Sequence, residues 1–382
     1  MKRRRFLYLG GLSVGLGLSC SNKAVNPQAI VDKTRVEKTH SASSDSLELN
    51  TSTAPPGFYA PKKGDVRLFV ISDLNSQYGS VTYRSGVEQA IQLIPDWNPD
   101  IVLCAGDMVA GQSLKLSSSQ VAAMWKGFDQ KIFNPIRNFG LPYAFTIGNH
   151  DASSFKGLDG KYVYETDRRE TNKYWSDKNP GLDFVDRYKF PFSYSFTHKE
   201  IYYLIWDASS AKVSSDDWIW AARNLASAEA QSAKMRIVMG HLPLYAVSQG
   251  RDRPGEILSK ADELRSLLEQ NSVHTYICGH HHVYYPGKVG KLEMLHCGAL
   301  GSGPRSWLES AKAPINTLTI VDVNLASQTT QYTTYDLGAR ETIALAQVPR
   351  QLVGPNGRVI RRDLTFEDLT YQELNQKHIK SH

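Results

Sequence analysis

Five short polar motifs occur in this chain, each at the point where an apolar, strand-like run ends. They are Ser-Asp-Leu-Asn at 72–75, Gly-Asp at 106–107, Gly-Asn-His-Asp at 148–151, Gly-His at 240–241 and Gly-His-His-His at 279–282. Because the carboxyl ends of strands in an open α/β sheet line one crevice, we expect these side chains to converge. Carboxylates, a carboxamide and imidazoles without a nearby thiolate suit Mn, Fe or Zn, and one ion would not need so many ligands.

Each of these residues also has a purely structural interpretation. Asp73 and Asp107 could cap the helices that follow them, which is a common use of Asp after a strand. His241 could be a half-buried histidine with satisfied hydrogen bonds. Neither role explains the Asn-His pair at 149–150 or the histidine run at 280–282, so a metal site is favoured. In that run we expect the outer two histidines to face the metals and His281 to point away.

The elements that would position these motifs alternate between short apolar runs and helical patterns, which is typical of βαβ units. We predict strands at 66–72, 101–105, 143–147, 192–196, 201–206, 236–239 and 275–278, helices at 86–97, 119–139, 216–233 and 261–269, and closing antiparallel strands at 292–297, 317–323 and 331–335. The fold class is α/β, with mixed β-sheet layers flanked by helices. The polar stretch at 152–191 shows no clear periodicity and is predicted to be a long loop or lid beside the site.

The N-terminus predicts export. Four basic residues at 2–5 precede an apolar stretch at 6–18 that is too short to span a bilayer. Arg-Arg-Arg-Phe-Leu at 3–7 resembles the twin-arginine pattern of bacterial export signals, with a generic secretory signal as the alternative. Leu18-Ser19-Cys20 resembles a lipoprotein processing site, although Gly17 stands where leucine is usual. We expect a periplasmic or cell-envelope protein, and a lipid anchor at Cys20 stays open.

Composition divides the rest of the chain. Residues 21–63 are polar without hydrophobic periodicity and are predicted to be a flexible linker. A folded domain should occupy 64–336, and a polar, basic C-terminal extension 337–382. The formal net charge is +6, but residues 2–5 contribute four of these charges, so +2 remains and specific nucleic-acid binding is not expected. Four cysteines are too few for a disulfide framework, and Cys104 and Cys278 should be buried thiols.

The order D-x-(H/N), G-D, G-N-H-D, G-H and G-H-x-H, each after a strand, resembles the calcineurin-like metallophosphoesterase superfamily over about residues 66–300. Within it, residues 192–245 are most similar to the branch that holds purple acid phosphatases and bacterial cyclic-nucleotide phosphodiesterases. The resemblance implies a metallophosphoesterase sandwich that hydrolyses phosphate esters with two metal ions and a bridging hydroxide nucleophile.

The resemblance also implies a role for each motif residue. The first metal would be held by Asp73, Asp107 and His282, with Asn75 where most members have histidine; the second would be held by Asn149, His241 and His280, with Asp107 bridging both. A bridge needs a carboxylate, whose two oxygens can serve cations roughly 3.5 to 4 Å apart. His150 would be the general acid or a phosphate clamp, oriented by Asp151, for which a plain turn role is the alternative.

Two departures from the family leave the substrate open. Ala110 stands where purple acid phosphatases have a metal-binding tyrosine, and Asn75 stands where cyclic-nucleotide phosphodiesterases usually have histidine. We therefore expect a small phosphorylated substrate, either a phosphomonoester or a phosphodiester. A non-catalytic member that binds a phosphorylated ligand or a partner is the competing hypothesis, but no motif residue that catalysis needs has been lost. Oligomeric state is left open.

Overall fold

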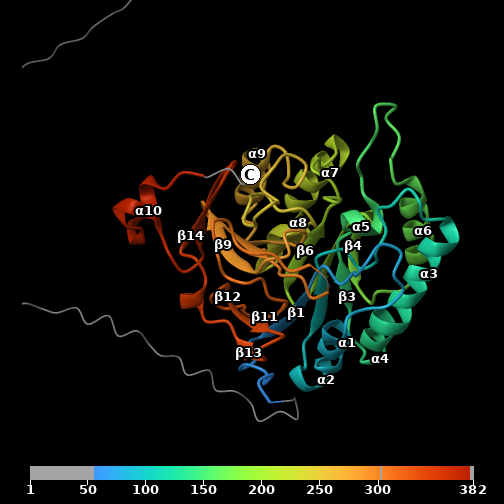
Figure 1. Ribbon diagram of the computed structural model, residues 1–382, viewed down its shortest axis with the longest axis horizontal. Coiled ribbons are helices and arrows are strands. Elements are labelled where there is room, and N and C mark those ends of the chain that lie inside the picture. Colours follow the sequence, from blue (N-terminus) through green and yellow to red (C-terminus); the bar gives the residue numbers. More distant parts are fainter. Residues whose placement is uncertain (1–55, 302, 379–382) are drawn as a thin grey trace, which may run out of the picture. The chain divides into compact units, whose positions relative to one another are not determined.

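The computed structural model describes residues 56–301 and 303–378 (Figure 1). The predicted export signal at 1–20, with its Cys20 processing site, and the linker up to residue 55 lie outside the described residues. Within the described residues, no helix is long and apolar enough to cross a membrane.

The first of two β-sheets contains the strands that carry the first three motifs. In spatial order it consists of β13 (Glu341–Thr342), β12 (Thr329–Asp336), β11 (Thr317–Asn324), β1 (Val66–Ile71), β2 (Ile101–Cys104) and β3 (Tyr143–Phe145). Strands β1, β2 and β3 are parallel, and β11 pairs antiparallel with β1. Every residue of β1 is buried, because Leu68 and Val70 pack into the core shared with the second sheet while Phe69 and Ile71 pack under helices. A strand buried on both faces needs the continuous apolar run that this sequence has.

The second sheet contains the strands that carry the histidine motifs. Its spatial order is β14 (Gln351–Gly354), β15 (Gly357–Arg361), β9 (Tyr285–Val289), β10 (Leu292–His296), β8 (Thr275–Cys278), β7 (Met235–Met239), β6 (Ile201–Ile205), β5 (Ser193–His198) and β4 (Asp183–Lys189). Strands β6, β7, β8 and β10 are parallel, and antiparallel strands flank them on both sides. The carboxyl ends of β7 and β8 therefore lie at one edge.

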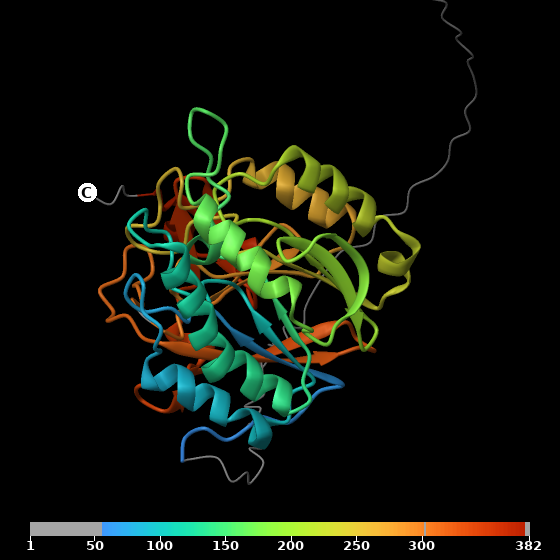
Figure 2. The ribbon, with the colours of Figure 1, turned by 90° about the vertical axis from the view of Figure 1, so that its right-hand side faces the viewer.

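Helices cover the outer faces of both sheets, and the two sheets lie between them (Figure 2). On the first sheet lie α1 (Ser85–Gln92), α2 (Ile94–Trp97), α3 (Ser118–Phe128), a π-helical turn (Asp129–Phe133), α4 (Asn134–Asn138) and α6 (Glu165–Ser176); on the second lie α7 (Ser215–Leu225), α8 (Ala228–Ser232) and α9 (Ala261–Gln270). The other helical elements of the described residues are the short helices α5 (Asn149–Ala152) and α10 (Tyr371–Asn375) and two 3₁₀ turns (Leu345–Gln347, Phe366–Asp368). The predicted α/β fold with mixed sheet layers and flanking helices is confirmed.

The polar stretch at 152–191 is not a long loop, because it contains α6 and β4. Its sequence hid the helix, since the twelve residues of α6 are mostly charged or polar. What holds α6 in place is a tertiary contact: Trp175 stacks on Phe145 of β3 with ring centroids 3.8 Å apart. A second difference concerns the predicted closing strands, which belong to two sheets, and of which β10 is parallel to β8.

The structure also moves both boundaries of the folded domain. Residues 56–63 were assigned to the linker, but Phe58 and Ala60 are buried and the Phe58 carbonyl accepts a 2.7 Å hydrogen bond from Trp97 Nε1. At the other end, the predicted C-terminal extension supplies β14 and β15, and β15 pairs with β9. Both segments are thus integral to the packed domain, because they cover apolar surface or complete a sheet.

Candidate metal centre

The five motifs meet where the carboxyl ends of the parallel strands from the two sheets come together. Backbone hydrogen bonds join the loops: Asp73 N–H donates to the Gly106 carbonyl (2.9 Å), and Gly279 N–H donates to the His241 carbonyl (3.0 Å). The His280 N–H lies 3.2 Å from both carboxylate oxygens of Asp73, which links the two sheets. The convergence expected from the strand ends is therefore present.

One group of ligand atoms consists of Asp73, Asp107 and His282, whose ligating atoms all lie within 4.8 Å of one another. His282 Nε2 is 3.1 Å from Asp73 Oδ1. Asp107 Oδ2 is buried and has no hydrogen-bond partner among the described residues. A buried carboxylate oxygen left in that state is costly. Because a cation would satisfy it, these residues fit a metal ion.

A second group surrounds the side-chain oxygen of Asn149. This Oδ1 lies 3.0 Å from His241 Nε2 and 2.8 Å from His280 Nδ1. Asp107 Oδ2 is 3.3 Å from the same His241 nitrogen, so Asp107 lies between the two groups. One oxygen and two imidazole nitrogens that face one another form a donor set suited to Mn, Fe or Zn. Each group draws ligands from both sheets.

The three histidines of the two groups share a second feature: in each, the ring nitrogen that faces away from the site has its own partner. His241 Nδ1 is 2.7 Å from the Ala105 carbonyl, and His282 Nδ1 is 2.7 Å from the Gly303 carbonyl. His280 Nε2 is 2.9 Å from Glu256 Oε2. An acceptor on the outer nitrogen fixes the tautomer and leaves the inner nitrogen free to ligate, as in metal-bound histidines.

The backbone at the ligands is strained. Asp73, Asp107, His280 and His282 have positive φ angles of 51°, 56°, 64° and 54°. Such angles cost a non-glycine residue about 1 to 3 kcal/mol and persist where the surroundings enforce them, often at functional sites. The neighbouring glycines make room, since a Cβ at Gly148 would collide with the carboxylate and backbone nitrogen of Asp107. The motif glycines therefore permit a close approach of two loops.

The buried carboxylates and imidazoles of the site shift one another's pKa values. Burial acts to raise the pKa of Asp107, but the adjacent His241 and His150 outweigh it and hold that pKa well below its usual range. Burial likewise opposes the lowered pKa of Asp73, which is dominated by its contact with His282. For His241, burial acts to lower the pKa, yet Asp107 raises it to about 9. Two ionised carboxylates thus lie buried beside the imidazoles.

His150, the predicted general acid, lies at the rim of the site. Its backbone N–H donates to Asp107 Oδ1 (2.9 Å), and its Nδ1 lies 3.2 Å from the Gly111 carbonyl. The half-buried ring contacts the exposed ring of Tyr78, with centroids 5.2 Å apart. Because Nδ1 donates to the carbonyl, Nε2 is the nitrogen available for a proton transfer.

The expectation that Asp151 orients the His150 imidazole is wrong. Both oxygens of this buried carboxylate instead accept backbone hydrogen bonds, from Asp107 N–H (2.9 Å), Gly148 N–H (2.8 Å) and Val109 N–H (2.9 Å). Burial, and secondarily the charge of Asp107, raises the pKa of Asp151 to about 7. Asp151 therefore holds the loops after β2 and β3 together, which is close to the plain turn role considered as its alternative.

Of the two remaining residues with a prediction, Asn75 lies beside the site and His281 points away from it. Asn75 is buried and its backbone N–H donates to the Asp107 carbonyl (3.1 Å), which places it beside the first group. His281 points away as expected, because its two nitrogens contact the Val247 N–H (3.3 Å) and the Glu256 carbonyl (3.2 Å).

Two residues of the site were missed by sequence reasoning. Glu256 supports His280 from the loop before α9. Gln112 Oε1 accepts a 2.7 Å hydrogen bond from Asn149 Nδ2, which turns the amide so that its oxygen faces the imidazoles. Both lie in irregular loops without a motif, and the only available signal was the position of Gln112 shortly after the Gly-Asp motif.

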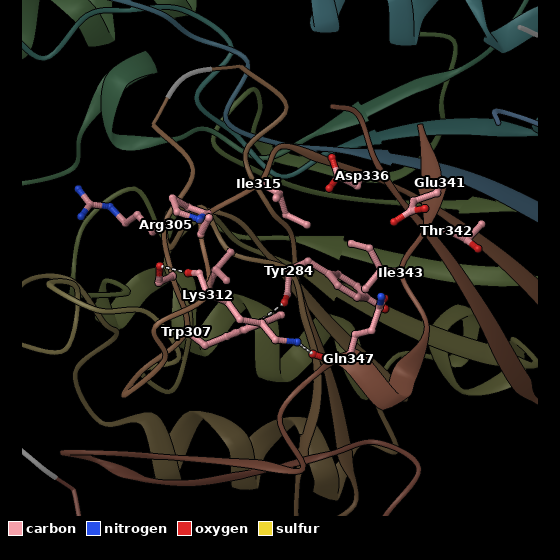
Figure 3. A pocket seen from close by; sticks show the side chains of 14 residues that line it. Tyr284, Arg305, Trp307, Lys312, Ile315, Asp336, Glu341, Thr342, Ile343 and Gln347 are labelled. Atoms are coloured by element: carbon pink, nitrogen blue, oxygen red, sulfur yellow. Dashed lines mark hydrogen bonds between the residues drawn. The ribbon is translucent and has the colours of Figure 1, made fainter. Parts of the chain in front are cut away.

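A separate cavity of about 300 Å³ is lined by residues that follow the ligand His282 in sequence, but it is not part of the metal centre (Figure 3). Its walls include Tyr284, Trp307, Ile315 and Ile343, and none of the predicted ligands lines it. Trp307 Nε1 donates to the Tyr284 carbonyl (2.8 Å) across one wall. This cavity and the candidate chemistry therefore occupy different places.

Comparisons with known proteins agree with this geometry. The family model described as calcineurin-like phosphoesterase matches residues 66–284. Similar solved structures include purple acid phosphatase PPD1 from yellow lupin (TM-score 0.51, 16% identity, covering 74% of this chain and 54% of that chain). Others are GAP50, the anchor in the inner membrane complex of Plasmodium (0.48, 13%, 74% and 88%), and a dimetal phosphatase from Danio rerio (0.47, 10%, 73% and 98%).

The chain spans about half the length of the lupin phosphatase, and at 16% identity this similarity shows a shared fold only. A search of curated protein sequences gave no match. The family match covers more than half of the chain, however, and contains every motif from 72–75 to 279–282. The predicted family is confirmed: the chain belongs to the calcineurin-like phosphoesterase family.

Proposed function

We propose that this protein hydrolyses small phosphate esters with two metal ions, Mn, Fe or Zn. The first ion would be held by Asp73, Asn75, Asp107 and His282, and the second by Asp107, Asn149, His241 and His280. The observation that carries the proposal is the buried Asp107 Oδ2, which lies 3.3 Å from His241 Nε2, accepts no hydrogen bond within the described residues and lies between the two groups of ligand atoms. When bound, the ions would activate water as a nucleophile and neutralise phosphoryl oxygens.

The protein's own contribution to turnover centres on His150. Because Nδ1 is occupied by the Gly111 carbonyl, a protonated His150 can donate only its Nε2 proton. We assign that proton to the oxygen of the leaving alcohol, a role worth on the order of 10² to 10⁴ in rate. The exposed Tyr78 ring beside it would border the leaving group.

Export is proposed on sequence grounds alone. The basic residues 2–5 and the apolar stretch 6–18 support a twin-arginine-like signal and a periplasmic or cell-envelope location, with a lipid anchor if Cys20 is processed. Fractionation of cells expressing the full chain, compared with a variant in which Arg3, Arg4 and Arg5 are replaced by Lys, tests this. Unchanged export of the Lys variant would remove the twin-arginine assignment.

The dinuclear assignment is tested by Asp107→Asn. A carboxamide bridges two cations poorly, so we expect loss of most hydrolysis of 4-nitrophenyl phosphate and bis(4-nitrophenyl) phosphate. Elemental analysis should find two metal ions per wild-type chain and fewer in the variant. Asp129→Asn, a carboxylate near the end of α3 and remote from the motifs, is the control for a lost charge.

Circular dichroism of Asp107→Asn is the control for folding. We expect a spectrum like that of wild type, because the Asn side-chain oxygen can still accept the hydrogen bond from the His150 N–H. Hydrolysis within tenfold of wild type, with unchanged metal content, would refute the dinuclear centre. Metal binding with no hydrolysis of any monoester or diester by the wild type would instead favour the ligand-binding alternative.

A further inference from the structure

Three arginines from two loops lie around the ligand histidines His280 and His282; we call Arg251, Arg253 and Arg305 the arginine cluster. Arg251 Nη1 lies 3.1 Å from His280 Nε2 and donates to Glu256 Oε2 at 2.6 Å. Arg253 Nη2 is 3.5 Å from Glu256 Oε1. The backbone N–H of Arg305 donates to the carbonyl of the ligand His282 (3.0 Å).

Within the arginine cluster, Arg305 is the residue whose side chain has no polar partner among the described residues. It makes no ion pair or side-chain hydrogen bond with the described part of the chain, and its Nε is buried. Figure 3 shows its guanidinium pointing away from the cavity that its backbone borders. The guanidinium reaches the loop of Arg251 instead, since its Nη1 would lie 3.6 Å from a Cβ at Gly250.

The charges around this guanidinium are unbalanced. Burial first, and then the nearby charge of Arg251, lower the pKa of Arg305, while Glu256 opposes the shift. Glu256 is already shared by Arg251, Arg253 and His280. The neighbouring Asp252 lies 3.5 Å from His378 Nε2. Arg251 Nε, like Arg305 Nε, is buried without a hydrogen-bond partner among the described residues.

The terminal N–H groups of Arg305 have no acceptor in the described part of the chain, and the chemistry that satisfies a guanidinium is an oxyanion that accepts two hydrogen bonds in one plane. We infer that the arginine cluster binds a second anionic group of the substrate, a carboxylate or a phosphate, while the reacting phosphoryl group lies at the metal ions. Arg305 is the specificity-determining residue. This inference rests on the proposed function, which it narrows to phosphate esters with two anionic groups.

The test compares esters that differ in one anionic group. Glycerol 3-phosphate and 3-phosphoglycerate differ by a carboxylate, and fructose 6-phosphate and fructose 1,6-bisphosphate differ by a phosphate. We expect kcat/KM to favour the second member of at least one pair by about tenfold or more, the lower end for hydrogen bonds to charged groups. The pair that shows the preference identifies the anionic group.

Arg305→Ala should reduce that preference about tenfold, mainly through KM, and Arg305→Lys should restore part of it, because charge remains while the planar fork is lost. Arg223→Ala, at an exposed position of α7, is the matched control and should leave the preference intact. Absence of a preference in both pairs, or a preference that survives Arg305→Ala, would overturn the inference.

Binding separates this inference from the proposed function. Isothermal titration of the metal-loaded protein with the same four esters measures binding affinity even if the protein hydrolyses none of them. Tighter binding of the second member of a pair, abolished by Arg305→Ala, with no hydrolysis of any ester, would retain the anion site and refute the hydrolase. Hydrolysis of 4-nitrophenyl phosphate, with equal binding of both members of each pair, would retain the hydrolase and refute the anion site.

Discussion

Glu256 allows the second metal site to be tested without changing a ligand. Its Oε2 accepts a hydrogen bond from Arg251 Nη1 and lies 2.9 Å from the outer nitrogen of His280. Burial acts to raise the pKa of Glu256, but its contacts with His280 and Arg251 outweigh this and hold the pKa well below the usual range. The side chain is therefore ionised at any ordinary assay pH.

Glu256→Gln keeps the size of the side chain and removes its charge. Arg251 Nη1 and His280 Nε2 both contact the same oxygen, Oε2, so the amide oxygen of Gln can still accept from both, but without the negative charge, and its NH₂ group would face Arg253 Nη2. The positive charge of Arg251 would also lie 3.1 Å from His280 without a carboxylate to oppose it. Loss of such an outer partner typically weakens metal binding 10- to 100-fold, or roughly 1.4 to 2.7 kcal/mol.

Isothermal titration of metal-free protein with Mn²⁺ or Zn²⁺ resolves the effect. We expect two binding steps in wild type, of which Glu256→Gln weakens one about 10- to 100-fold and leaves the other, assigned to Asp73, Asp107 and His282, within about threefold. Glu263→Gln, at an exposed position of α9, is the control. If both steps weakened equally, or neither changed, Glu256 would not act through His280.

Three further variants give separate tests. His150→Ala should retain both metals but lower turnover by about 10² to 10⁴, most for esters whose leaving alcohols have a high pKa; an equal loss across leaving groups would reduce His150 to phosphate binding. Asn75→Ala should raise the metal concentration needed for half-maximal activity, and Asn75→His should favour Zn or Fe over Mn; titrations superimposable on wild type would show that Asn75 is no ligand. Burial raises the pKa of Asp167 to about 6, so the stability that its neutral form contributes is present at low pH and is lost as the pH rises through that value. Asp167→Asn should therefore gain in free energy of unfolding relative to wild type as the pH rises from about 4 to about 6, between the pKa of a free Asp, 3.8, and that of Asp167, and parallel pH profiles from denaturant titrations would contradict this.

The motif residues could be predicted because their positions follow from topology. Asp73, Asp107 and His241 come directly after buried strands, and strand ends that share an edge bring side chains together whatever their separation in sequence. The support of these ligands could not be predicted. Glu256 and Gln112 act from irregular loops, where neither periodicity nor motif spacing constrains position.

The same distinction explains the errors in the fold. α6 was missed because its polar sequence carries little amphipathic signal, and the contact of Trp175 with Phe145 is tertiary. The linker was extended too far because the short apolar run at 58–60 shows no periodicity beside a long polar stretch, and the burial of Phe58 depends on Trp97 and Tyr335, remote in sequence. Asp151 was expected to orient the His150 imidazole because the two residues are adjacent in the motif, whereas its carboxylate accepts hydrogen bonds from three backbone N–H groups.

The division of ligands between the sheets has a consequence for the whole domain. Asp73, Asp107 and Asn149 follow strands of the first sheet, whereas His241, His280 and His282 follow strands of the second, and each proposed ion takes ligands from both. Each bound ion would therefore cross-link the two sheets of the domain. Since a ligand that binds only the folded state stabilises it, the metal supply would set the resistance of this protein to heat and proteolysis as well as its rate of turnover.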